Sequence, residues 1–264
     1  AYQQFLAAAP KAPQRAEALR RLGDLEMDRA DRVAAEATGA NASGIPDYKA
    51  AVERYEAFLK TYPDDPKNDR VLYQLARAQE QAGDLEGALK TLTLLVSKHP
   101  GTLHAGEAQF RRGELLFAMR QYKPAEEAYG AVLAGEDKTA FTERALYMQG
   151  WSRFKQGRLE DGLASFFGVL DLKLGNLSPL AREEADLAEI RELTRADREL
   201  LDDSFRVMSI SFAALNGAEG IGKYIAGPTQ RQREDYQFRV FSQLGELYIK
   251  QDRIKDAADT YALF

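Results

Sequence analysis

The chain has 264 residues, of which 45% are hydrophobic, 29% charged and 10% aromatic. A chain this apolar can bury a core, which excludes a disordered protein. No run approaches the roughly 18 uninterrupted apolar residues that a membrane-spanning helix needs.

Charge and cysteine content narrow the functional class. The 41 acidic and 36 basic side chains give a net charge of −5, so the positive stripe of a nucleic-acid reader is not seen overall. The chain has no cysteine, which excludes disulfides, thiolate chemistry and cysteine-ligated zinc. Zero cysteines in a chain of this length favours an envelope or extracellular setting.

Small residues recur along the chain at a constant interval of 37 residues. Each is followed by large residues in the same order, and a second ladder of small residues runs beside the first. Three equal steps with one side-chain pattern indicate an internal repeat, which decides the fold class. The first ladder is Ala51, Ala88, Ala125 and Gly162, and the second is Ala76, Gly113 and Gly150.

Apolar residues within each copy have helical spacing, recurring at i+3 and i+4. Short turns at 83–84 and 156–157 separate two helices, and Pro63 and Pro100 close their units because proline cannot continue a helix. We therefore expect each unit to be a helix–turn–helix, with the small residues where two helices cross closely. The spacing is seen in Leu72, Leu75, Ala76 and Gln79, and again in Ala88, Leu92, Leu95 and Val96.

This pattern resembles the tetratricopeptide repeat (TPR): leucine and a small residue in the first helix, alanine and then an aromatic in the second, and a terminal proline. The resemblance covers roughly 1–174 and 236–264, and it rests on recurrence rather than on any one copy. The period of 37 exceeds the usual 34, which suggests longer loops between repeats. The best single copy contains Leu244, Gly245, Tyr248, Ala257 and Tyr261.

The predicted array occupies residues 1–174, and both ends of the chain resemble interrupted repeats. Residues 1–10 match the end of a second helix, which predicts a fragment of a longer array. An insertion near 29–46 extends the first helix of the first full unit to about Ala37. A loop then leads to a predicted helix cap at Asp47.

The register is lost over 175–235, which we interpret as a degenerate repeat with an extra helix. Ser178 and Pro179 are typical of a helix start. A long helix is predicted over about 195–215, and 236–264 is a repeat truncated in its second helix. One face of the long helix carries Phe205, Met208, Phe212 and Leu215.

A glycine-rich segment at 217–223 fits the spacing of a phosphate-binding loop, G-x-x-x-x-G-K. That loop needs Ser or Thr after the lysine to hold magnesium, whereas this chain has Tyr224. It also needs a parallel sheet, and no other segment resembles a strand. We therefore interpret 217–223 as a turn between the two helices of the degenerate repeat.

Candidate metal and catalytic residues are few. His99 and His104 are the only histidines, and two histidines without a third ligand do not make a zinc site, so packing or surface roles are expected. The acidic pairs at 64–65 and 202–203 are assigned to a loop and to a helix start, with capping or solvated roles. No cofactor, metal site or catalytic constellation is predicted.

The residues expected to bind a partner lie on first helices, because the resemblance implies that these helices line the concave face. Tyr73, Phe110 and Tyr147 lie 37 apart, although an aromatic at this position can instead pack against the preceding repeat. Trp151 is assigned to the groove, with core packing as its alternative. Tyr, Trp and Arg dominate binding hot spots. The full predicted set is Arg70, Tyr73, Arg77, Phe110, Arg144, Tyr147, Trp151, Phe154 and Lys155.

The carboxylate clamp of the chaperone-binding members, built from Lys and Asn, is absent. Its positions carry Tyr73 with Arg77, Phe110 with Glu114, and Tyr147 with Trp151. The segment ALYMQG, the closing Tyr-Pro and the long period instead resemble bacterial envelope TPR proteins. Examples are the outer-membrane assembly lipoprotein and the Tol–Pal-associated repeat protein.

The sequence thus predicts an all-α, right-handed superhelical TPR solenoid that acts as a non-catalytic protein-interaction scaffold. A protein or peptide is expected in the concave groove, without nucleic acid and without direct membrane insertion. The expected setting is a bacterial cell-envelope assembly, periplasmic or outer-membrane-associated, with the cytoplasm as the alternative. In the alternative function, this array belongs to a larger protein whose catalytic or ligand-binding domain lies outside these residues.

Overall fold

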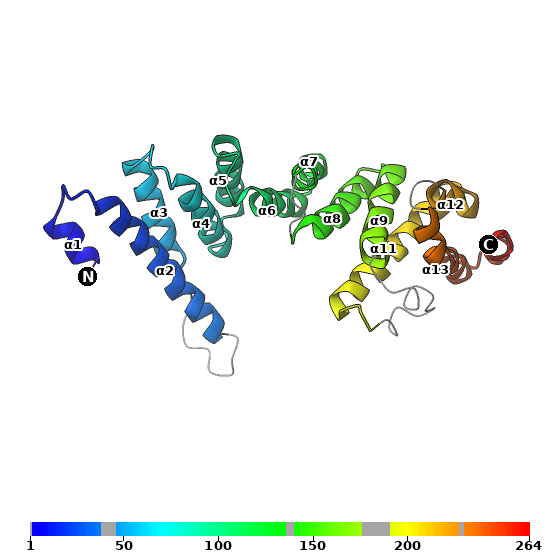
Figure 1. The fold of residues 1–264 in the computed structure, drawn as a ribbon. Coiled ribbons are helices and arrows are strands. Elements are labelled where there is room, and N and C mark those ends of the chain that lie inside the picture. Colours follow the sequence, from blue (N-terminus) through cyan, green and yellow to red (C-terminus); the bar gives the residue numbers. More distant parts are fainter. Residues whose placement is uncertain (1, 38–45, 136–139, 176–190, 227–229) are drawn as a thin grey trace. The chain divides into compact units, whose positions relative to one another are not determined.

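The computed structural model describes residues 2–37, 46–135, 140–175, 191–226 and 230–264, and every regular element in these ranges is a helix (Figure 1). The predicted all-α class is confirmed. Two compact units, Ala1–Met119 and Arg120–Phe264, each have their own hydrophobic cores. This division by compactness does not test the repeat boundaries, which stay predictions.

In the first unit, each helix packs against the next one along the chain. Two core clusters fill the spaces, one around Tyr55 and Phe58 and one around Leu92 and Leu95. The helices are α1 (Tyr2–Ala8), α2 (Arg15–Ala37), α3 (Lys49–Thr61), α4 (Asn68–Gln81), α5 (Leu85–Lys98) and α6 (Ala105–Ala118).

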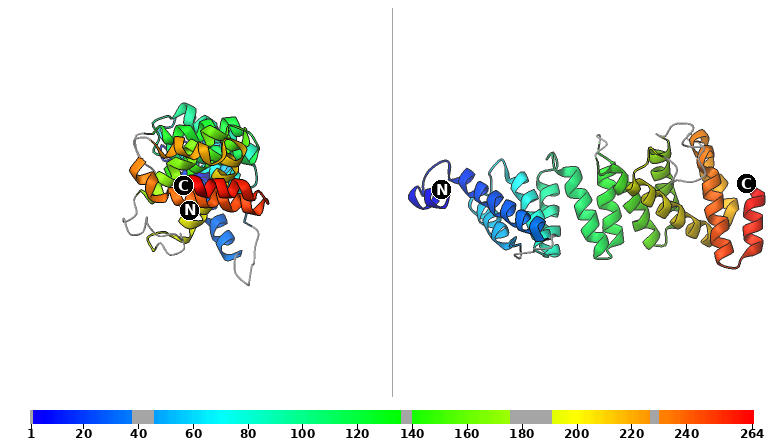
Figure 2. Two further views of the ribbon diagram at one scale, coloured as in Figure 1. Left: turned by 90° about the vertical axis from the view of Figure 1, so that its right-hand side faces the viewer. Right: turned by 90° about the horizontal axis from the view of Figure 1, so that it is seen from below.

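In the second unit, one larger core extends from α9 to α14. The long helix α11 packs against α9, α12 and α13, while α13 and α14 run antiparallel (Figure 2). The helices are α7 (Tyr122–Leu133), α8 (Thr142–Lys155), α9 (Leu159–Leu174), α11 (Arg195–Ala214), α12 (Gly217–Ile225), α13 (Gln230–Lys250) and α14 (Ile254–Leu263).

The small residues of the second ladder lie where two helices cross, as predicted. A Cβ on Gly150 of α8 would lie 3.0 Å from the ring of Phe166 on α9. Gly245 meets Tyr261 in the same way, 16 residues later, at 2.5 Å. At the earlier position of the ladder, Ala76 is fully buried. The aromatic ring therefore packs directly on the glycine backbone, which explains why no larger residue stands there.

The predicted turns are confirmed, and they share a backbone conformation. Gly83 and Gly157 adopt positive φ angles of 82° and 76°, and Arg120 and Asp252 adopt 59° at the equivalent positions. All four lie seven residues after the small residue of the first helix. Glycine takes this left-handed conformation without a steric penalty, whereas other L-residues adopt it only at a cost.

Two local features of the first unit match their predictions, whereas the predicted cap at Asp47 is one residue off, because the N-cap of α3 is Tyr48 and no side chain caps it. The helix α2 ends at Ala37, and Pro63 and Pro100 follow the ends of α3 and α5. Asp47 lies just before α3, where its carboxylate accepts a hydrogen bond from the backbone N–H of Lys49 at 3.1 Å.

The segment at 217–223 is helical, so the predicted turn is wrong. It forms most of α12, while the connection from α11 passes through Leu215 and Asn216. Gly220 and Ile221 are buried, and the preceding segment belongs to α11 rather than to a strand. Only the first glycine of the segment is restricted: Gly217 has a positive φ of 57°, and a Cβ on it would lie 3.1 Å from the hydroxyl oxygen of Tyr248. The predicted helix start at Ser178 and Pro179 lies outside the described residues.

The long predicted helix is confirmed as α11. Phe205, Met208 and Phe212 are buried on one face, but Leu215 lies beyond the helix end and is 38% exposed. Among the described residues, no helix combines the length and apolarity needed to cross a bilayer.

Candidate partner-binding site

The predicted aromatic residues of α8 sit in its last two and a half turns, and the helix end fixes their position. The N–H of Arg158 bonds to the carbonyl of Arg153, and the N–H of Gly157 bonds to that of Phe154. This pair of bonds is the Schellman motif, which ends a helix sharply with a left-handed glycine. Trp151, Phe154 and Lys155 are thereby held on a rigid element.

Asp203 of α11 anchors the exposed edge of this aromatic group. Its Oδ2 accepts hydrogen bonds from the hydroxyl of Tyr147 at 2.5 Å and from the indole N–H of Trp151 at 3.2 Å. Its Oδ1 accepts from Arg206 Nε at 3.0 Å. Three donors from two helices therefore converge on one carboxylate, which fixes the rings of both aromatics.

The Trp151 ring lies between the core and two cations. It is partly buried against the core of the second unit and meets Phe154 and Phe166 edge-on, with centroids 5.4 and 6.2 Å apart. Lys155 Nζ lies 5.6 Å from the ring centroid, and the guanidinium carbon of Arg206 lies 5.9 Å from it. Cations at such distances contribute about 0.5 to 2 kcal/mol each, least where they are exposed.

Tyr147 is electrostatically perturbed at the same place. Burial raises the pKa of Tyr147 to about 12, with a further contribution from its hydrogen bond to the Asp203 carboxylate. The phenol is therefore neutral at ordinary pH and acts as a hydrogen-bond donor.

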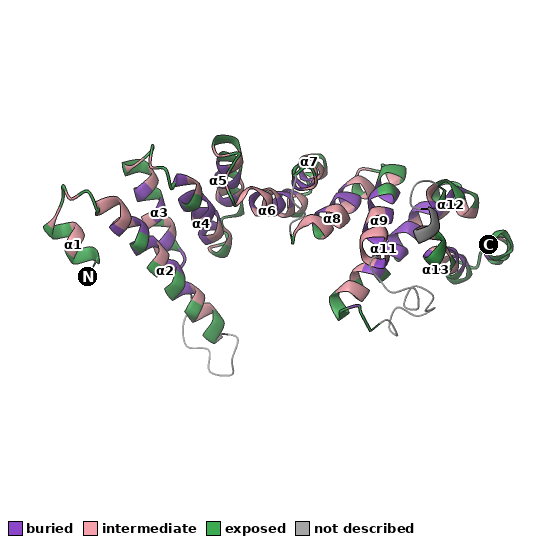
Figure 3. Cartoon of the chain, in the orientation of Figure 1, coloured by how far each residue is buried: buried purple, intermediate pink, exposed green. Residues whose placement is uncertain are grey.

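A pocket of about 490 Å³ lies beside this cluster, between α8 and the first turns of α11. Its apolar part includes Met148 and Leu200, and Tyr147 lines it as well. Lys173 of α9 bridges Glu143 at 2.7 Å and Asp197 at 2.5 Å on the pocket wall. We call this pocket and the Trp151–Asp203 cluster the α8–α11 groove. In Figure 3, α8, α9 and α11 each carry buried residues.

Other predicted site residues of the second unit lie around this groove. Arg144 is exposed and lines the pocket, Phe154 packs partly against the core, and Lys155 is exposed. The structure thus brings together the five predicted residues of α8. Their role in binding stays a prediction.

The predicted aromatics of the first unit are buried. Tyr73 is 8% exposed and stacks on His104 with ring centroids 4.2 Å apart, and Phe110 is 2% exposed. Burial raises the pKa of Tyr73, and Glu107 raises it further. Core packing was the alternative to a groove position for these aromatics, and both Tyr73 and Phe110 pack in the core. Their rings therefore cannot serve as exposed anchors for a partner.

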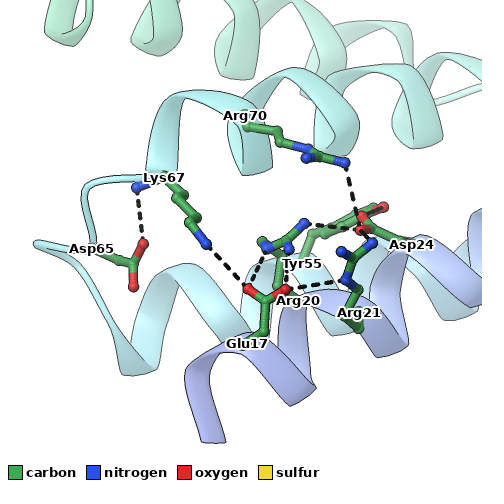
Figure 4. A network of polar contacts seen from close by, with 8 residues as sticks. All are labelled: Glu17, Arg20, Arg21, Asp24, Tyr55, Asp65, Lys67 and Arg70. Carbon is green, nitrogen blue, oxygen red and sulfur yellow. Dashed lines mark hydrogen bonds and ion pairs between the residues drawn. The ribbon is translucent and has the colours of Figure 1, made fainter. Parts of the chain in front are cut away.

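The predicted arginines Arg70 and Arg77 line a smaller pocket, of about 170 Å³, between α2 and α4. Arg70 approaches Asp24 at 3.8 Å, and Arg77 approaches Asp31 at 4.0 Å. Figure 4 shows Arg70 reaching across to Asp24 of α2, beside the network that joins Glu17 and Arg20. Both arginines face carboxylates of the neighbouring first helix.

The sequence analysis missed Asp203, Arg206 and Lys173. The pair 202–203 was assigned to a helix start, which is wrong because both residues lie near the middle of α11. The 37-residue register fails before α11, so no spacing in the sequence relates Asp203 to Trp151. The only feature of the sequence that could have indicated a role for Asp203 is its position among the apolar residues of a predicted amphipathic helix.

The remaining candidates are structural in the described residues. Asp65 accepts a hydrogen bond from the backbone N–H of Lys67 at 2.9 Å, which is a turn contact. His99 caps the end of α5. No group of three or more His, Asp or Glu residues within the described part of the chain could hold a metal ion.

Comparison with protein families identifies the repeats. Two family profiles, both described as tetratricopeptide repeat, match residues 42–109 and 105–171. Residues 42–171 therefore match the tetratricopeptide repeat, and the matches support this family for the chain. The finer resemblance to envelope proteins has no counterpart among these matches. No curated protein sequence matches the chain significantly.

Solved structures share the fold. The chain is similar to a crystal structure of MamA protein, with a TM-score of 0.53 and 15% identity over 86% of this chain and 94% of the other. It is also similar to a kinesin light chain-like protein of Podosopora anserina with nearly identical TPR-like repeats. There the TM-score is 0.50 and the identity 15%, over 90% and 98% of the two chains. The predicted TPR solenoid class is confirmed, and the two repeat matches support a protein-interaction scaffold.

Proposed function

We propose that the chain is a non-catalytic scaffold that binds a protein segment in the α8–α11 groove. One observation carries the proposal: the only tryptophan of the chain is held half-buried beside a pocket of about 490 Å³. A rigid, partly desolvated tryptophan next to an apolar recess has the character of a binding hot spot.

The groove favours a partner segment with an apolar anchor and acidic flanks. Met148, Leu200 and Tyr147 offer an apolar recess for one side chain. Arg144 and Lys155 are exposed around it and place positive charge at the rim, while Arg206 is paired with Asp203. Electrostatic complementarity of this kind increases association rates and selects against basic partners.

A displayed library of random peptides, selected on the full chain, tests the proposal. Because Trp151 is the sole tryptophan, its fluorescence reports directly on occupancy of the groove. We expect selected peptides to change this emission saturably. Trp151→Ala should weaken binding about thirtyfold, equivalent to about 2 kcal/mol, as measured by anisotropy of labelled peptides.

Phe238→Ala is the matched control, because Phe238 is an exposed aromatic of α13 in the same unit and does not line the groove. It should leave peptide affinity unchanged. If Trp151→Ala lowers the melting temperature sharply while peptide affinity is kept, Trp151 is a core residue and the groove proposal is wrong.

We further propose that the scaffold works in a bacterial cell-envelope assembly, periplasmic or outer-membrane-associated. The absence of cysteine and the resemblance to envelope TPR proteins support this setting. Fractionation of cells that express the complete natural protein tests it, because an exclusively cytoplasmic location would contradict the proposal.

A further inference from the structure

The pocket of the α8–α11 groove has an ion triad in its lining. Lys173 Nζ of α9 lies 2.7 Å from Glu143 Oε2 of α8 and 2.5 Å from Asp197 Oδ1 of α11. All three side chains line the pocket of about 490 Å³, together with the apolar side chains of Met148 and Leu200. A partner side chain that fills this pocket therefore meets both apolar and charged groups.

Asp197 uses both of its oxygens within the protein. Its Oδ1 pairs with Lys173, and its Oδ2 accepts hydrogen bonds from the hydroxyl of Thr194 at 2.7 Å and from the backbone N–H of Thr194 at 2.9 Å. Burial opposes the ionisation of Asp197, but its hydrogen bonds to Lys173 and Thr194 outweigh this effect and lower its pKa. Asp197 is therefore a fixed anion that holds the ammonium group of Lys173 in place.

Glu143 and Lys173 each keep capacity for a further hydrogen bond. Glu143 meets Lys173 through Oε2, so within the described part of the chain its Oε1 remains an acceptor. An ammonium group has three N–H donors, and the two carboxylates take two of those of Lys173. The side chains of Glu143 and Lys173 are 30% and 20% exposed, so a ligand can reach them. The pocket thus offers one acceptor and one donor side by side.

These groups restrict the side chain that can enter the pocket. Among the described residues, the charged side chains of the lining are Glu143, Asp197, Arg144 and Lys173, two of each sign. A charged tip would lose its hydration without meeting a net opposite charge. A hydroxyl is neutral and both donates and accepts, whereas an indole only donates. Ser, Thr, Asn and Gln lack a large apolar body to cover the apolar part of the pocket. Tyrosine alone combines a ring with a hydroxyl tip.

We propose that this pocket selects a tyrosine of the protein partner, whose ring packs on Met148 and Leu200. The tyrosine hydroxyl donates a hydrogen bond to Glu143 Oε1 and accepts one from Lys173 Nζ. This inference rests on the proposed function of the α8–α11 groove, and it makes Glu143 and Lys173 the residues that determine specificity there. A site that hydrogen-bonds a hydroxyl discriminates against the analogue that lacks it.

Three amino-acid amides test the pocket directly. N-acetyl-L-tyrosinamide, its O-methyl ether and N-acetyl-L-phenylalaninamide are titrated into the full chain, and the labelled methyl group of Met148 is followed by NMR. Met148→Leu identifies this signal among the four methionines. We expect the tyrosine amide to shift the signal saturably, with about tenfold higher affinity than the phenylalanine amide, as for one hydrogen bond to a charged group. The ether cannot donate to Glu143 and should bind like the phenylalanine amide.

A pair of matched variants tests the acceptor. Glu143→Met should abolish the preference for tyrosine, whereas Glu127→Met, at an exposed position of α7 outside the pocket, should keep it. If Glu143→Met does not fold, the three amides on the unaltered chain still decide. Equal affinity of the tyrosine and phenylalanine amides, an unmoved Met148 signal, or a preference retained in folded Glu143→Met would each overturn the inference.

Trp151→Ala separates this inference from the proposed function. Trp151 does not line the pocket, so the variant should weaken selected peptides and keep the preference for the tyrosine amide. Selected peptides that need Trp151 but bind equally well when their tyrosine is replaced by phenylalanine would overturn the tyrosine anchor and leave the groove intact. A preferred tyrosine amide with no selectable peptide would contradict the groove and support the tyrosine pocket.

Discussion

Both units place aspartates of one first helix against donors from neighbouring helices, but the donors differ. In the first unit, Asp24 and Asp31 accept hydrogen bonds from the hydroxyls of Tyr55 and Tyr48, and the arginines of α4 stay at longer range. In the second unit, Asp203 accepts directly from Tyr147 and Trp151 of another first helix. Aspartate therefore faces arginines at ion-pair distance at one site and fixes aromatic rings by hydrogen bonds at the other.

The two sites also differ in their link to the core. Tyr147 and Trp151 pack against the large core of the second unit and meet Phe166 edge-on. Arg70 is half exposed, and its unit is held by smaller clusters beneath it. Changes at the aromatic site should therefore affect stability and binding together, whereas changes at the arginines of the first unit should affect stability little.

The largest effect is expected when the support of the aromatic site is removed. Phe166→Ala should lower the free energy of unfolding by about 3–5 kcal/mol, because Phe166 is fully buried and packs on Gly150, Tyr147 and Trp151. Chemical denaturation followed by Trp151 fluorescence measures it. A loss below about 1 kcal/mol would show that the groove is independent of the core.

Overpacking the same helix crossing should have a smaller effect. Gly150→Leu should cost about 1–3 kcal/mol, because even a Cβ would lie 3.0 Å from the Phe166 ring. Gly222→Ala is the matched control, since a Cβ there meets nothing within 4 Å, and it should be neutral or stabilising. Thermal melts that do not distinguish the two variants would argue against the repeat alignment.

The fold and α8 were predictable because both depend on local signals that repeat. A small residue with a large one 16 residues later, and a left-handed turn between them, recur in the copies that contain Ala76, Gly113, Gly150 and Gly245. The partners of Trp151 were not predictable, because Asp203 lies 52 residues away beyond the point where the register fails. For α12 the glycines were misleading, since a left-handed residue at the start of a helix and a turn favour the same residue, and Gly220 and Gly222 lie in the helix itself.

Removing the carboxylate that fixes the rings tests the comparison directly. Asp203→Asn weakens the acceptor of the hydrogen bonds from Tyr147 and Trp151. It should lower the free energy of unfolding by about 1 kcal/mol. It should also lower the pKa of Tyr147 from about 12, to which burial and Asp203 raise it. Ultraviolet titration of the phenol, with Tyr147→Phe to identify its signal, measures the shift.

The raised pKa of Tyr147 has a defined consequence for stability. Its folded value of about 12 exceeds the ordinary value of 10.0, so the fold favours the neutral phenol. This contribution is complete below pH 10 and is lost as pH rises toward 12. The difference in unfolding free energy between wild type and Tyr147→Phe should be constant from pH 7 to 9 and smaller at pH 11. A constant difference up to pH 11 would contradict this assignment.

The smallest effect is expected in the first unit. Arg70→Gln with Arg77→Gln should change the unfolding free energy by less than about 1 kcal/mol, because their ion pairs are long and near the surface and the one hydrogen bond of Arg77 is to Gln74 on its own helix. Urea denaturation measures it. A loss as large as that of Phe166→Ala would place these arginines in the structural framework of the first unit.

The glycine–aromatic crossing has a consequence for how such chains tolerate added sequence. In the first unit, a Cβ on Gly23 would lie 2.6 Å from Tyr55, the same contact as elsewhere, although 32 residues separate the two instead of 16. The glycine–aromatic contact therefore forms even when the segment between the two residues is twice as long. Doubling the length of a flexible loop raises the free-energy cost of closing it by only about 0.6 kcal/mol. The connection between α2 and α3 is therefore a natural point for grafting a reporter or a guest domain without disturbing the helix pair.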